Sequence, residues 1–570
     1  MVWRGLLVGA AIASYLLRCR AATEAARFTQ DQPHPHTMSK GPHGEASSDL
    51  ASREIASLEG APAATAIGAN DTRFFGHPLG LSNLFFTELF ERFSYYGMRA
   101  LLVLFMTAAT VDGGLGYDVA TSALIYGLYT SLVYLVNLPG GWIADRLLGQ
   151  RKSVLVGGII IAAGHFTMAI PSTAMFFTGL GLIVIGTGLL KPNISVMVGQ
   201  LYPPEDARRD AGFTIFYMGI NMGAFAAPLI CGALQVNYGW HFGFAAAGVG
   251  MTIGMIVYLL FGKQLDGVGD LTPDAVREKS SSISMFTKGI LGVLVLFGVI
   301  GGLMATGIIG TTAEAISDVY KYLLFAIVIG LFGWLFTRDY WTDLERKRLY
   351  LIGLLFIGAA VFWAAFEQAG SSLNLFAQES TDRTVGSALS WIPGLGGGEI
   401  PAAWFQSLNA MFIFTIAPIV ASIWLWLGRR GKDPSSPTKF GIGLVLLGLG
   451  FVVMIGAGTA AAAGAQVSPM WLVLTYLLHT LGELTLSPVG LSAMTKLAPA
   501  RVSSLMMGVW FLGASVGNFI AGYIASFYEM MELPSFMGLV AAISIAAGVV
   551  FFFVAGPFKK MMAKAEGPAV

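Results

Sequence analysis

The segment 88–97 reads Glu-Leu-Phe-Glu-Arg-Phe-Ser-Tyr-Tyr-Gly and lies inside an apolar run long enough to cross a lipid bilayer. Glu88, Glu91 and Arg92 are spaced at i, i+3 and i+4, so a helix places all three charges on one face. A charge at the centre of a bilayer costs roughly 2.5–3.5 kcal/mol on insertion scales. Membrane proteins keep such charges where they face a water-filled cavity, so the segment predicts a membrane helix that lines a transport pathway.

The composition indicates an integral membrane protein. Of the 570 residues, 55% are apolar and 12% are charged, and the mean hydropathy is +0.69; a soluble domain carries about 25% charged residues. The net charge is +1 and the basic residues are scattered between apolar runs, so we expect no nucleic-acid partner. Cys19 and Cys231 are the two cysteines, which predicts no disulfide framework. We find no metal-ligand spacing, P-loop or dinucleotide motif, and expect no metal and no cofactor.

Fourteen apolar runs approach or exceed the ~20 residues that a membrane helix needs. They lie at 79–107, 119–144, 152–171, 174–198, 211–234, 241–262, 286–308, 317–337, 349–378, 402–428, 438–461, 470–495, 503–528 and 533–556. Lys and Arg gather in alternate connecting loops, for example Arg146, Arg151 and Lys152, and Arg383 is the main exception. The positive-inside rule then places both termini in the cytoplasm, as expected for a multi-pass protein of the inner (plasma) membrane.

Residues 1–72 differ from the rest and predict a disordered tail with no part in transport. Residues 6–17 form an apolar stretch of signal-peptide length. Met38 is an alternative translation start, since it opens a polar segment rich in Ser, Ala and Gly. The sequence leaves open whether residues 1–37 are translated or cleaved.

A series of further motifs follows 88–97 in a fixed order. They lie at 140–149, 186–193, 216–225, 362–368, 407–409 and 482–492. Together the motifs resemble those of the proton-coupled oligopeptide transporter family (POT/PTR), a branch of the major facilitator superfamily, and the resemblance extends over residues 73–556. Chance agreement of several motifs in one order is a poor explanation.

The resemblance implies an all-α polytopic membrane protein of the bacterial type, in which two six-helix bundles are joined through a two-helix insertion. The expected parts are the tail 1–72, the N-terminal bundle 73–262, the linker and insertion 263–345, the C-terminal bundle 346–556 and a cytoplasmic tail 557–570. Substrate is expected to bind between the bundles near the middle of the membrane, and the bundles to rock around it.

A zwitterionic peptide needs charges of both signs at separate positions. Arg92 and Lys191 are the cations expected near its carboxylate, because Arg holds a carboxylate bidentately and Lys acts as a movable point charge. Glu367 and Glu483 are the acids that could receive the amino group. The resemblance places Glu483 near the amino group, and asparagines and aromatic residues around the peptide. The substrate-binding residues that it implies are Arg92, Tyr95, Tyr96, Arg99, Tyr134, Lys191, Asn221, Trp363, Glu367, Asn409, Glu483 and Trp510.

The expected proton-coupling residues are Glu88, Glu91, Arg92, Lys191 and Glu367. A carboxyl group beside a cation favours its ionised form, and one isolated in the cavity favours its protonated form. We expect protonation of Glu88 and Glu91 to be linked to substrate binding in this way, and an Arg99–Glu367 pair to gate the outer side. Two simpler interpretations stay open: Glu88 and Glu91 merely neutralise the cations, or Glu367 merely stabilises Arg99.

One position departs from the family pattern. Some members carry a histidine seven residues before the tyrosine that matches Tyr134, and here that position is Gly127. A histidine-based proton step is therefore unavailable in the second helix, and the acidic residues must carry the coupling.

We predict a proton-coupled symporter, not an enzyme, that imports di- and tripeptides by alternating access. Its partners are then the peptide, protons as the coupling ion and the lipid bilayer; the sequence assigns no oligomeric state. One alternative is transport of nitrate, another small anion or another solute of the same family, although Glu483 does not suit an anion. A peptide sensor with little flux and an intramembrane enzyme that uses Glu88 or Glu367 as acid or base are the others.

Overall fold

The computed structural model describes residues 71–203, 206–308, 310–385 and 398–566. Over these ranges the chain forms helices joined by turns, and strand pairing is limited to isolated bridges such as that of Phe74 with His77. Nearly all of the predicted tail 1–72 lies outside the described residues.

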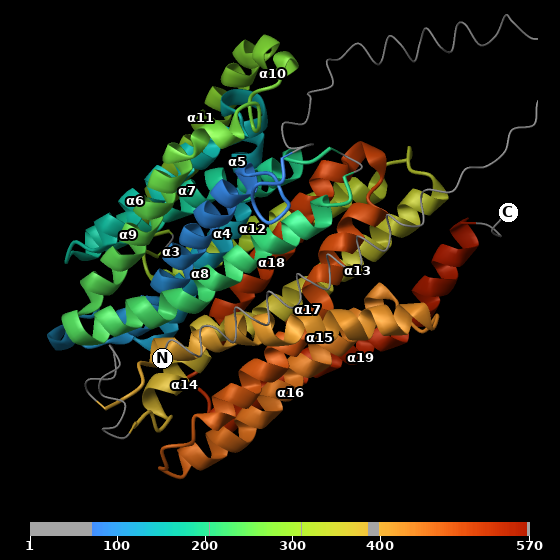
Figure 1. Ribbon diagram of the computed structural model, residues 1–570. Coiled ribbons are helices and arrows are strands. Elements are labelled where there is room, and N and C mark those ends of the chain that lie inside the picture. The colour runs from blue at the N-terminus through green and yellow to red at the C-terminus, as the bar shows by residue number, and fades with distance from the viewer. Residues whose placement is uncertain (1–70, 204–205, 309, 386–397, 567–570) are drawn as a thin grey trace, which may run out of the picture. The chain divides into compact units, whose positions relative to one another are not determined.

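The long helices follow the predicted apolar runs (Figure 1). The first set is α3 (Gly80–Thr107), α4 (Val119–Leu135), α5 (Asn137–Ile143), α6 (Gln150–Met168), α7 (Thr173–Gln200), α8 (Arg209–Tyr238) and α9 (Trp240–Leu260). Next come α10 (Pro273–Arg277), α11 (Lys279–Ala305) and α12 (Ala313–Thr337). The last set is α13 (Asp343–Phe366), α14 (Ser372–Glu379), α15 (Ser407–Arg429), α16 (Ser436–Ala462), α17 (Met470–Leu497), α18 (Ser503–Ala525) and α19 (Leu533–Glu566).

Eleven spans in the described part of the chain are long and apolar enough to cross a membrane. The other three predicted runs are also helical, in α3, α6 and α11, but they are not among these eleven spans. In α3 the charges, among them Glu88, Glu91 and Arg92, lower the mean hydropathy of the helix. The total of fourteen crossings therefore stays a prediction.

The helices pack in two sets that meet along two seams. In the first set α3 lies against α8 and α9, and α6 lies against α7 and α9. In the last set α16 lies against α17 and α19, and α13 lies against α18 and α19. The sets meet where α4 packs on α18 and α8 packs on α15. We call these sets the first and the last helix set. The structure does not test the residue boundaries that the sequence predicts for the two bundles.

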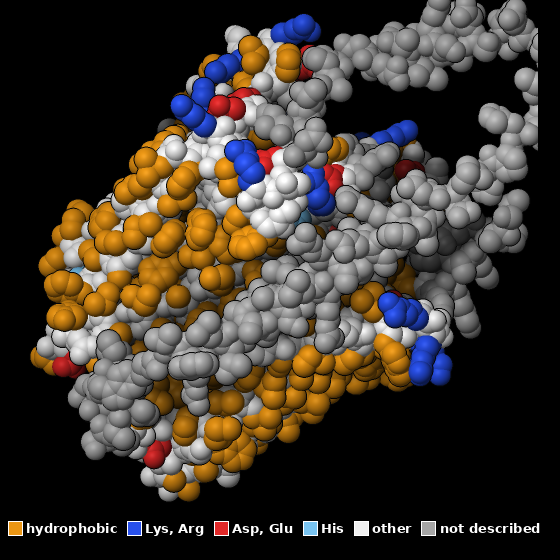
Figure 2. All heavy atoms as spheres, viewed as in Figure 1, with side chains coloured by type: hydrophobic (Ala, Val, Ile, Leu, Met, Phe, Trp, Pro, Cys, Tyr) orange, Lys and Arg blue, Asp and Glu red, His pale blue; other side chains and the backbone are white. Residues whose placement is uncertain are grey.

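Apolar side chains cover the outer faces of the helices. Figure 2 shows this hydrophobic surface, with Lys and Arg gathered near α10 and sparse on the apolar face. Ile159, Ile185 and Ile253 illustrate it, with exposed fractions of 53%, 55% and 41%. An exposed apolar surface of this extent is typical of a lipid-facing protein.

The start of α3 is fixed to the connection between α7 and α8. The Asp71 carboxylate accepts a hydrogen bond from the Leu79 backbone N–H at 2.9 Å, and Arg208 donates to the Asp71 carbonyl at 3.0 Å. The Nδ1 atom of His77 lies 2.9 Å from the Tyr202 hydroxyl. Burial lowers the pKa of His77, so its neutral form is favoured here. These bonds hold the helix that carries the 88–97 motif.

The helix α12 reaches the seam between α4 and α18. Tyr320 of α12 is buried, and its hydroxyl lies 2.8 Å from the Ser131 Oγ atom of α4. Ser515 of α18 donates to the Ser131 carbonyl at 2.8 Å, and the two serine hydroxyls are 2.9 Å apart. The Tyr320 ring packs edge-on against Phe519, also of α18. Helix α12 thus contributes to the contact between the two helix sets.

Replacing Tyr320 by phenylalanine removes one hydroxyl from this network while Ser131 and Ser515 still pair with each other. We expect a loss of about 1 kcal/mol and a thermal midpoint in detergent lower by about 1–3 °C. Tyr322→Phe is the matched control, because Tyr322 follows two residues later and is 71% exposed. Equal midpoints for the two variants would contradict a role for the Tyr320 hydroxyl in the seam.

Candidate substrate and proton site

The helix α3 brings the charges of its motif together as the i, i+3, i+4 spacing predicts. Glu88, Glu91 and Arg92 are 3%, 1% and 3% exposed. The Arg92 Nε atom lies 3.0 Å from Glu88 Oε1 and 2.5 Å from Glu91 Oε2. One guanidinium therefore serves two carboxylates, and the Arg92 side chain also lies over the Tyr95 ring at 5.6 Å. A buried charge is costly unless it is paired, and each of these three charges has a partner of opposite sign.

Lys191 of α7 is the second cation of this region. Its Nζ atom lies 4.4 Å from the centre of the Tyr134 ring and 6.0 Å from that of Tyr95. It interacts electrostatically with Glu88 and Arg92, yet within the described part of the chain no carboxylate lies at ion-pair distance from it. A cation held over aromatic rings stays available to an anionic ligand.

The acid of the last helix set is Glu483 on α17. Asn409 of α15 donates to the Glu483 Oε2 atom at 2.9 Å and to the Thr480 hydroxyl at 3.0 Å. Asn409 thus orients Glu483 in this structure, and its predicted bond to a peptide stays a prediction. Asn221 of α8 is buried and donates to the Tyr217 carbonyl one turn earlier in its own helix.

The predicted aromatic residues lie in two places: the tyrosines lie beside the cations Arg92, Arg99 and Lys191, and the tryptophans lie in the last helix set. The Tyr95 and Tyr96 rings lie edge to face, 5.2 Å apart. Tyr96 lies under the Arg99 guanidinium at 5.6 Å and interacts electrostatically with Glu483 across the two helix sets. The Trp363 and Trp510 side chains instead pack within the last helix set.

Trp363 of α13 contacts the Phe366 ring at 5.3 Å. Trp510 of α18 is 7% exposed and lies so close to Gly490 of α17 that any side chain at that glycine would overlap its ring. Both tryptophans therefore have a packing role in this structure, and their predicted contact with substrate stays a prediction.

The predicted pair of Arg99 and Glu367 is present, and it has a third member that the sequence analysis missed. The Arg99 Nη2 atom lies 2.8 Å from Glu367 Oε2. Arg99 also donates through Nε to the Tyr126 hydroxyl at 2.8 Å, and that hydroxyl donates to Glu367 Oε2 at 3.1 Å. All three residues are less than 5% exposed. We call Arg99, Tyr126 and Glu367 the gate cluster; a tyrosine in an apolar helix gave no signal in the sequence.

Further hydrogen bonds join the two helix sets. Asn374 of α14 donates to the Ala100 carbonyl at 2.9 Å. Ser407 of α15 donates to the Phe225 carbonyl of α8 at 2.8 Å. The gate cluster therefore belongs to a closed contact between the sets, toward the Thr107 end of α3.

The structure gives a physical reason for the absence of a histidine at position 127. A Cβ atom on Gly127 would lie 2.7 Å from the Gly522 Cα atom and 3.0 Å from its backbone nitrogen. Backbone atoms of α18 thus occupy the space that a side chain would need. The helices α4 and α18 meet backbone to backbone at this point, and a histidine does not fit there.

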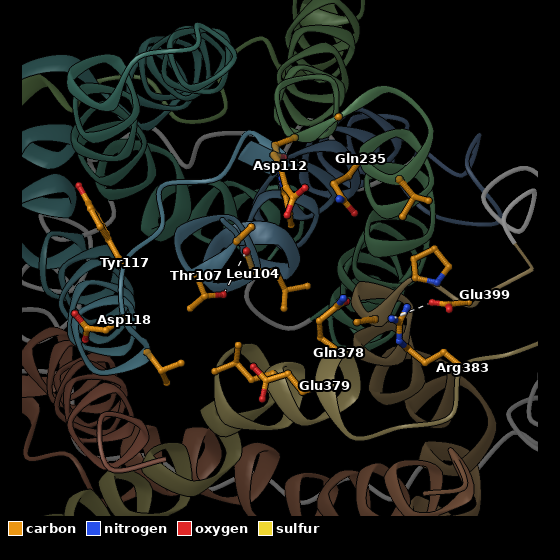
Figure 3. A pocket seen from close by; sticks show the side chains of 18 of the residues that line it. Leu104, Thr107, Asp112, Tyr117, Asp118, Gln235, Gln378, Glu379, Arg383 and Glu399 are labelled. Atoms are coloured by element: carbon orange, nitrogen blue, oxygen red, sulfur yellow. Dashed lines mark hydrogen bonds and ion pairs between the residues drawn. The ribbon is translucent and has the colours of Figure 1, made fainter. Parts of the chain in front are cut away.

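A cavity of about 710 Å³ opens beyond the gate cluster, at the Thr107 end of α3 (Figure 3). Thr107 and Asp118 line it from the first helix set, and Glu379 lines it from α14. The ion pair of Arg383 with Glu399, 3.1 Å long, borders it. None of the predicted site residues lines this cavity. Across the described residues, no group of His, Cys, Asp and Glu is placed to hold a metal ion.

The sequence pattern of the POT family matches residues 151–538. The chain is similar to the peptide transporter YePEPT of Yersinia enterocolitica subsp. palearctica, at 42% identity over 87% of this chain and 97% of the relative. It is similar to the di-/tripeptide transporter of Lactococcus lactis subsp. cremoris, at 36% identity over 87% of this chain and 99% of the relative. Among solved structures, the peptide transporter POT in complex with sulfate matches with a TM-score of 0.79 and 40% identity, over 87% of this chain and 98% of that chain.

The family match covers more than half of the 570 residues, and the relatives match over nearly their whole length. The POT neighbours have the major facilitator fold, so the predicted all-α membrane fold is confirmed, as is the resemblance on which it rested. The chain is a multi-pass membrane protein and belongs to the POT family of transporters.

Proposed function

We propose that this protein is a symporter that imports di- and tripeptides together with protons. The observation that carries the proposal is a pair of charged groups of opposite sign on the two helix sets. Lys191 lies on α7 and Glu483 on α17, and neither forms an ion pair with another described side chain. A short zwitterionic peptide supplies the missing partner to each of them.

The relatives support the peptide as the substrate class. YePEPT is named a peptide transporter, and the Lactococcus relative is named a di-/tripeptide transporter. A free anion pairs with Lys191 but leaves Glu483 without a partner and is repelled by it, so transport of small anions is not favoured. The proposed activity moves the peptide without changing it chemically.

The proposed peptide orientation follows from the charges. The carboxylate binds Lys191 and Arg92, and the amino group binds Glu483, which Asn409 holds in place. Asn221 is proposed to bond the peptide backbone once the bond to its own helix is released. Tyr95, Tyr96 and Tyr134 present apolar area with a polar tip, which suits varied peptide side chains, and Trp363 and Trp510 are proposed to extend this pocket.

Proton coupling is proposed to arise at the Arg92 cluster. Glu88 and Glu91 share one guanidinium, as their ion pairs with Arg92 indicate. When the peptide carboxylate draws Arg92 and Lys191 away, a glutamate that loses its cation binds a proton more readily. The proton is thus taken up with the peptide, and protons are the coupling ion with no further cofactor. A proton that moves down 100 mV provides about 2.3 kcal/mol, enough for more than tenfold accumulation.

The orientation in the membrane is proposed from the basic loops. Gly80, at the start of α3, lies against the Gln264–Leu265 turn, and Arg151 donates to the neighbouring Gly262 carbonyl. These loops carry Lys and Arg, so the Gly80 end of α3 is cytoplasmic by the positive-inside rule. Both termini are then cytoplasmic, the membrane is the plasma membrane, and the Arg99–Glu367 gate closes the outer side.

Uptake of labelled dialanine into proteoliposomes tests the proposal. We expect accumulation above the external concentration only with an inward proton gradient and a potential negative inside. Unlabelled dipeptides and a protonophore should each abolish it. Equilibration independent of the gradient would keep the peptide and reject the coupling role of Glu88 and Glu91. Peptide binding without uptake would indicate a sensor, and neither binding nor uptake would reject the peptide as ligand.

A further inference from the structure

The gate cluster is built from three elements of the two helix sets. Arg99 comes from α3 and Tyr126 from α4, whereas Glu367 begins the short helix η4 (Glu367–Gly370) that follows α13. The Tyr126 side chain is fully buried, and its hydroxyl accepts from Arg99 and donates to Glu367. Both hydrogen-bonding roles of the hydroxyl are therefore used, one toward each member of the ion pair.

Gly370 makes the space that Tyr126 occupies. A Cβ atom on Gly370 would overlap the Tyr126 hydroxyl and would lie 2.9 Å from the Arg99 Nε atom. The Tyr126 hydroxyl thus packs directly against the backbone at the end of η4, where Gly370 has no side chain. An alanine at this position would push the hydroxyl off both Arg99 and Glu367, because its Cβ atom takes the space that the buried hydroxyl occupies.

We infer that Tyr126, seated on Gly370, is a positioning residue that holds Arg99 and Glu367 in their closed arrangement. The inference rests on the proposed function, in which this cluster closes the outer side. The hydroxyl fixes the direction of the Arg99 guanidinium by taking its Nε–H, which leaves Nη2 aimed at the Glu367 carboxylate. Without the hydroxyl, Nε stays buried and unpaired in the closed state, whereas water pairs with it when the outer side opens.

The consequence is a shift of population toward the open outer side. A buried donor left unpaired in one of two states disfavours that state by roughly tenfold or more. A transporter that faces outward more often binds external peptide more readily, so its apparent KM falls. Its maximal rate falls as well, because closure becomes the slow step. A lower KM together with a lower maximal rate distinguishes this effect from damage to the peptide site, which raises KM.

Tyr126→Phe is the test, with Tyr129→Phe as the matched control. Tyr129 follows by one turn on the same helix, is 4% exposed, and its hydroxyl has no hydrogen-bond partner among the described residues. We expect Tyr126→Phe to lower the maximal rate of proton-driven dialanine uptake about tenfold and to lower KM several-fold. Tyr129→Phe should leave both within about twofold. Identical kinetics for the two variants, or a raised KM in Tyr126→Phe, would overturn the inference.

Labelling of a cysteine in the cavity wall separates this inference from the proposed function, since it requires no transport. Leu375 of α14 lines the cavity and is 1% exposed. In a chain carrying Cys19→Ser, Cys231→Ala and Leu375→Cys, we expect an impermeant maleimide to react from outside faster when Tyr126→Phe or Gly370→Ala is added. Gly181→Ala is the control for the glycine, because nothing lies within 4 Å of a Cβ there. Unchanged labelling in both gate variants would reject the positioning role even in a protein with no peptide uptake.

Discussion

Lys191→Ala is expected to abolish proton-driven accumulation of dialanine in proteoliposomes and to leave some exchange of peptide across the membrane. Lys191 is the cation without a carboxylate partner among the described residues, and it lies 4.4 Å from the Tyr134 ring centre. Recruiting it to a peptide carboxylate breaks no existing ion pair, whereas recruiting Arg92 disturbs two. Its loss removes a charge-assisted bond of about 1.5–3 kcal/mol, which weakens binding by roughly 10- to 150-fold.

The loss of accumulation follows from the loss of the link between peptide and proton. Without Lys191 the bound carboxylate no longer shifts the cations away from the glutamates, so peptide binding and protonation become independent. Exchange persists because Arg92 and Glu483 remain. Glu88→Gln should give the same phenotype by removing the proton site, since glutamine keeps the shape of the side chain but binds no proton.

The measurement compares uptake with and without the proton gradient, and then counterflow exchange at zero gradient. Lys321→Ala is the control, because Lys321 on α12 pairs with Asp318 outside this site. We expect it to retain accumulation. Accumulation above the external concentration in Lys191→Ala or Glu88→Gln would show that these residues do not couple the proton.

Local spacing was sufficient to predict the charge cluster of α3. Glu88, Glu91 and Arg92 lie within one helical turn, so their contact depends only on the helix forming. The helical runs were predictable for a similar reason, because a lipid environment requires long apolar segments whose backbone bonds are internal. Whether α3 crosses the membrane is harder to predict from the sequence, since its charges lower its mean hydropathy.

Contacts between distant helices could not be read from spacing. The Arg99–Glu367 pair was expected because of the family resemblance, and nothing in the local sequence pairs those two residues. Tyr126 escaped notice because a tyrosine in an apolar helix is most often a packing residue, and its role depends on which groups the fold brings to its hydroxyl. Asn409 was expected to face substrate, and the fold places its amide on Glu483.

The same limit applies to glycine. A glycine in an apolar run is compatible with many packing arrangements, and only the neighbouring backbone shows which glycine is needed. Gly127 was noticed as a missing histidine, but the reason for it lies in α18, nearly four hundred residues further along the chain, where Gly522 is its neighbour.

Gly127→Ala is expected to lower the maximal rate of dialanine uptake at least about fivefold, because α4 and α18 can no longer meet as they do here. The added Cβ atom would lie 2.7 Å from the Gly522 Cα atom, and backbone atoms in two packed helices cannot move aside as a flexible side chain does. Forcing an extra carbon into a packed interior costs about 1–3 kcal/mol. The closed outer state alone bears this cost if the seam separates on opening, so its population falls by roughly 5- to 150-fold.

Gly522→Ala should reproduce the defect, because its Cβ atom would meet the Ala123 carbonyl oxygen and the Gly127 backbone. The double variant should be worse than either single one but not by the sum of their effects, since both disturb one contact. Gly181→Ala on α7 is the control: it adds the same methyl group to a membrane helix where no atom lies within 4 Å. Uptake kinetics of the four variants decide the matter. If Gly127→Ala transports as fast as Gly181→Ala, the two helices do not need this close approach to close the outer side, and the missing histidine requires another explanation.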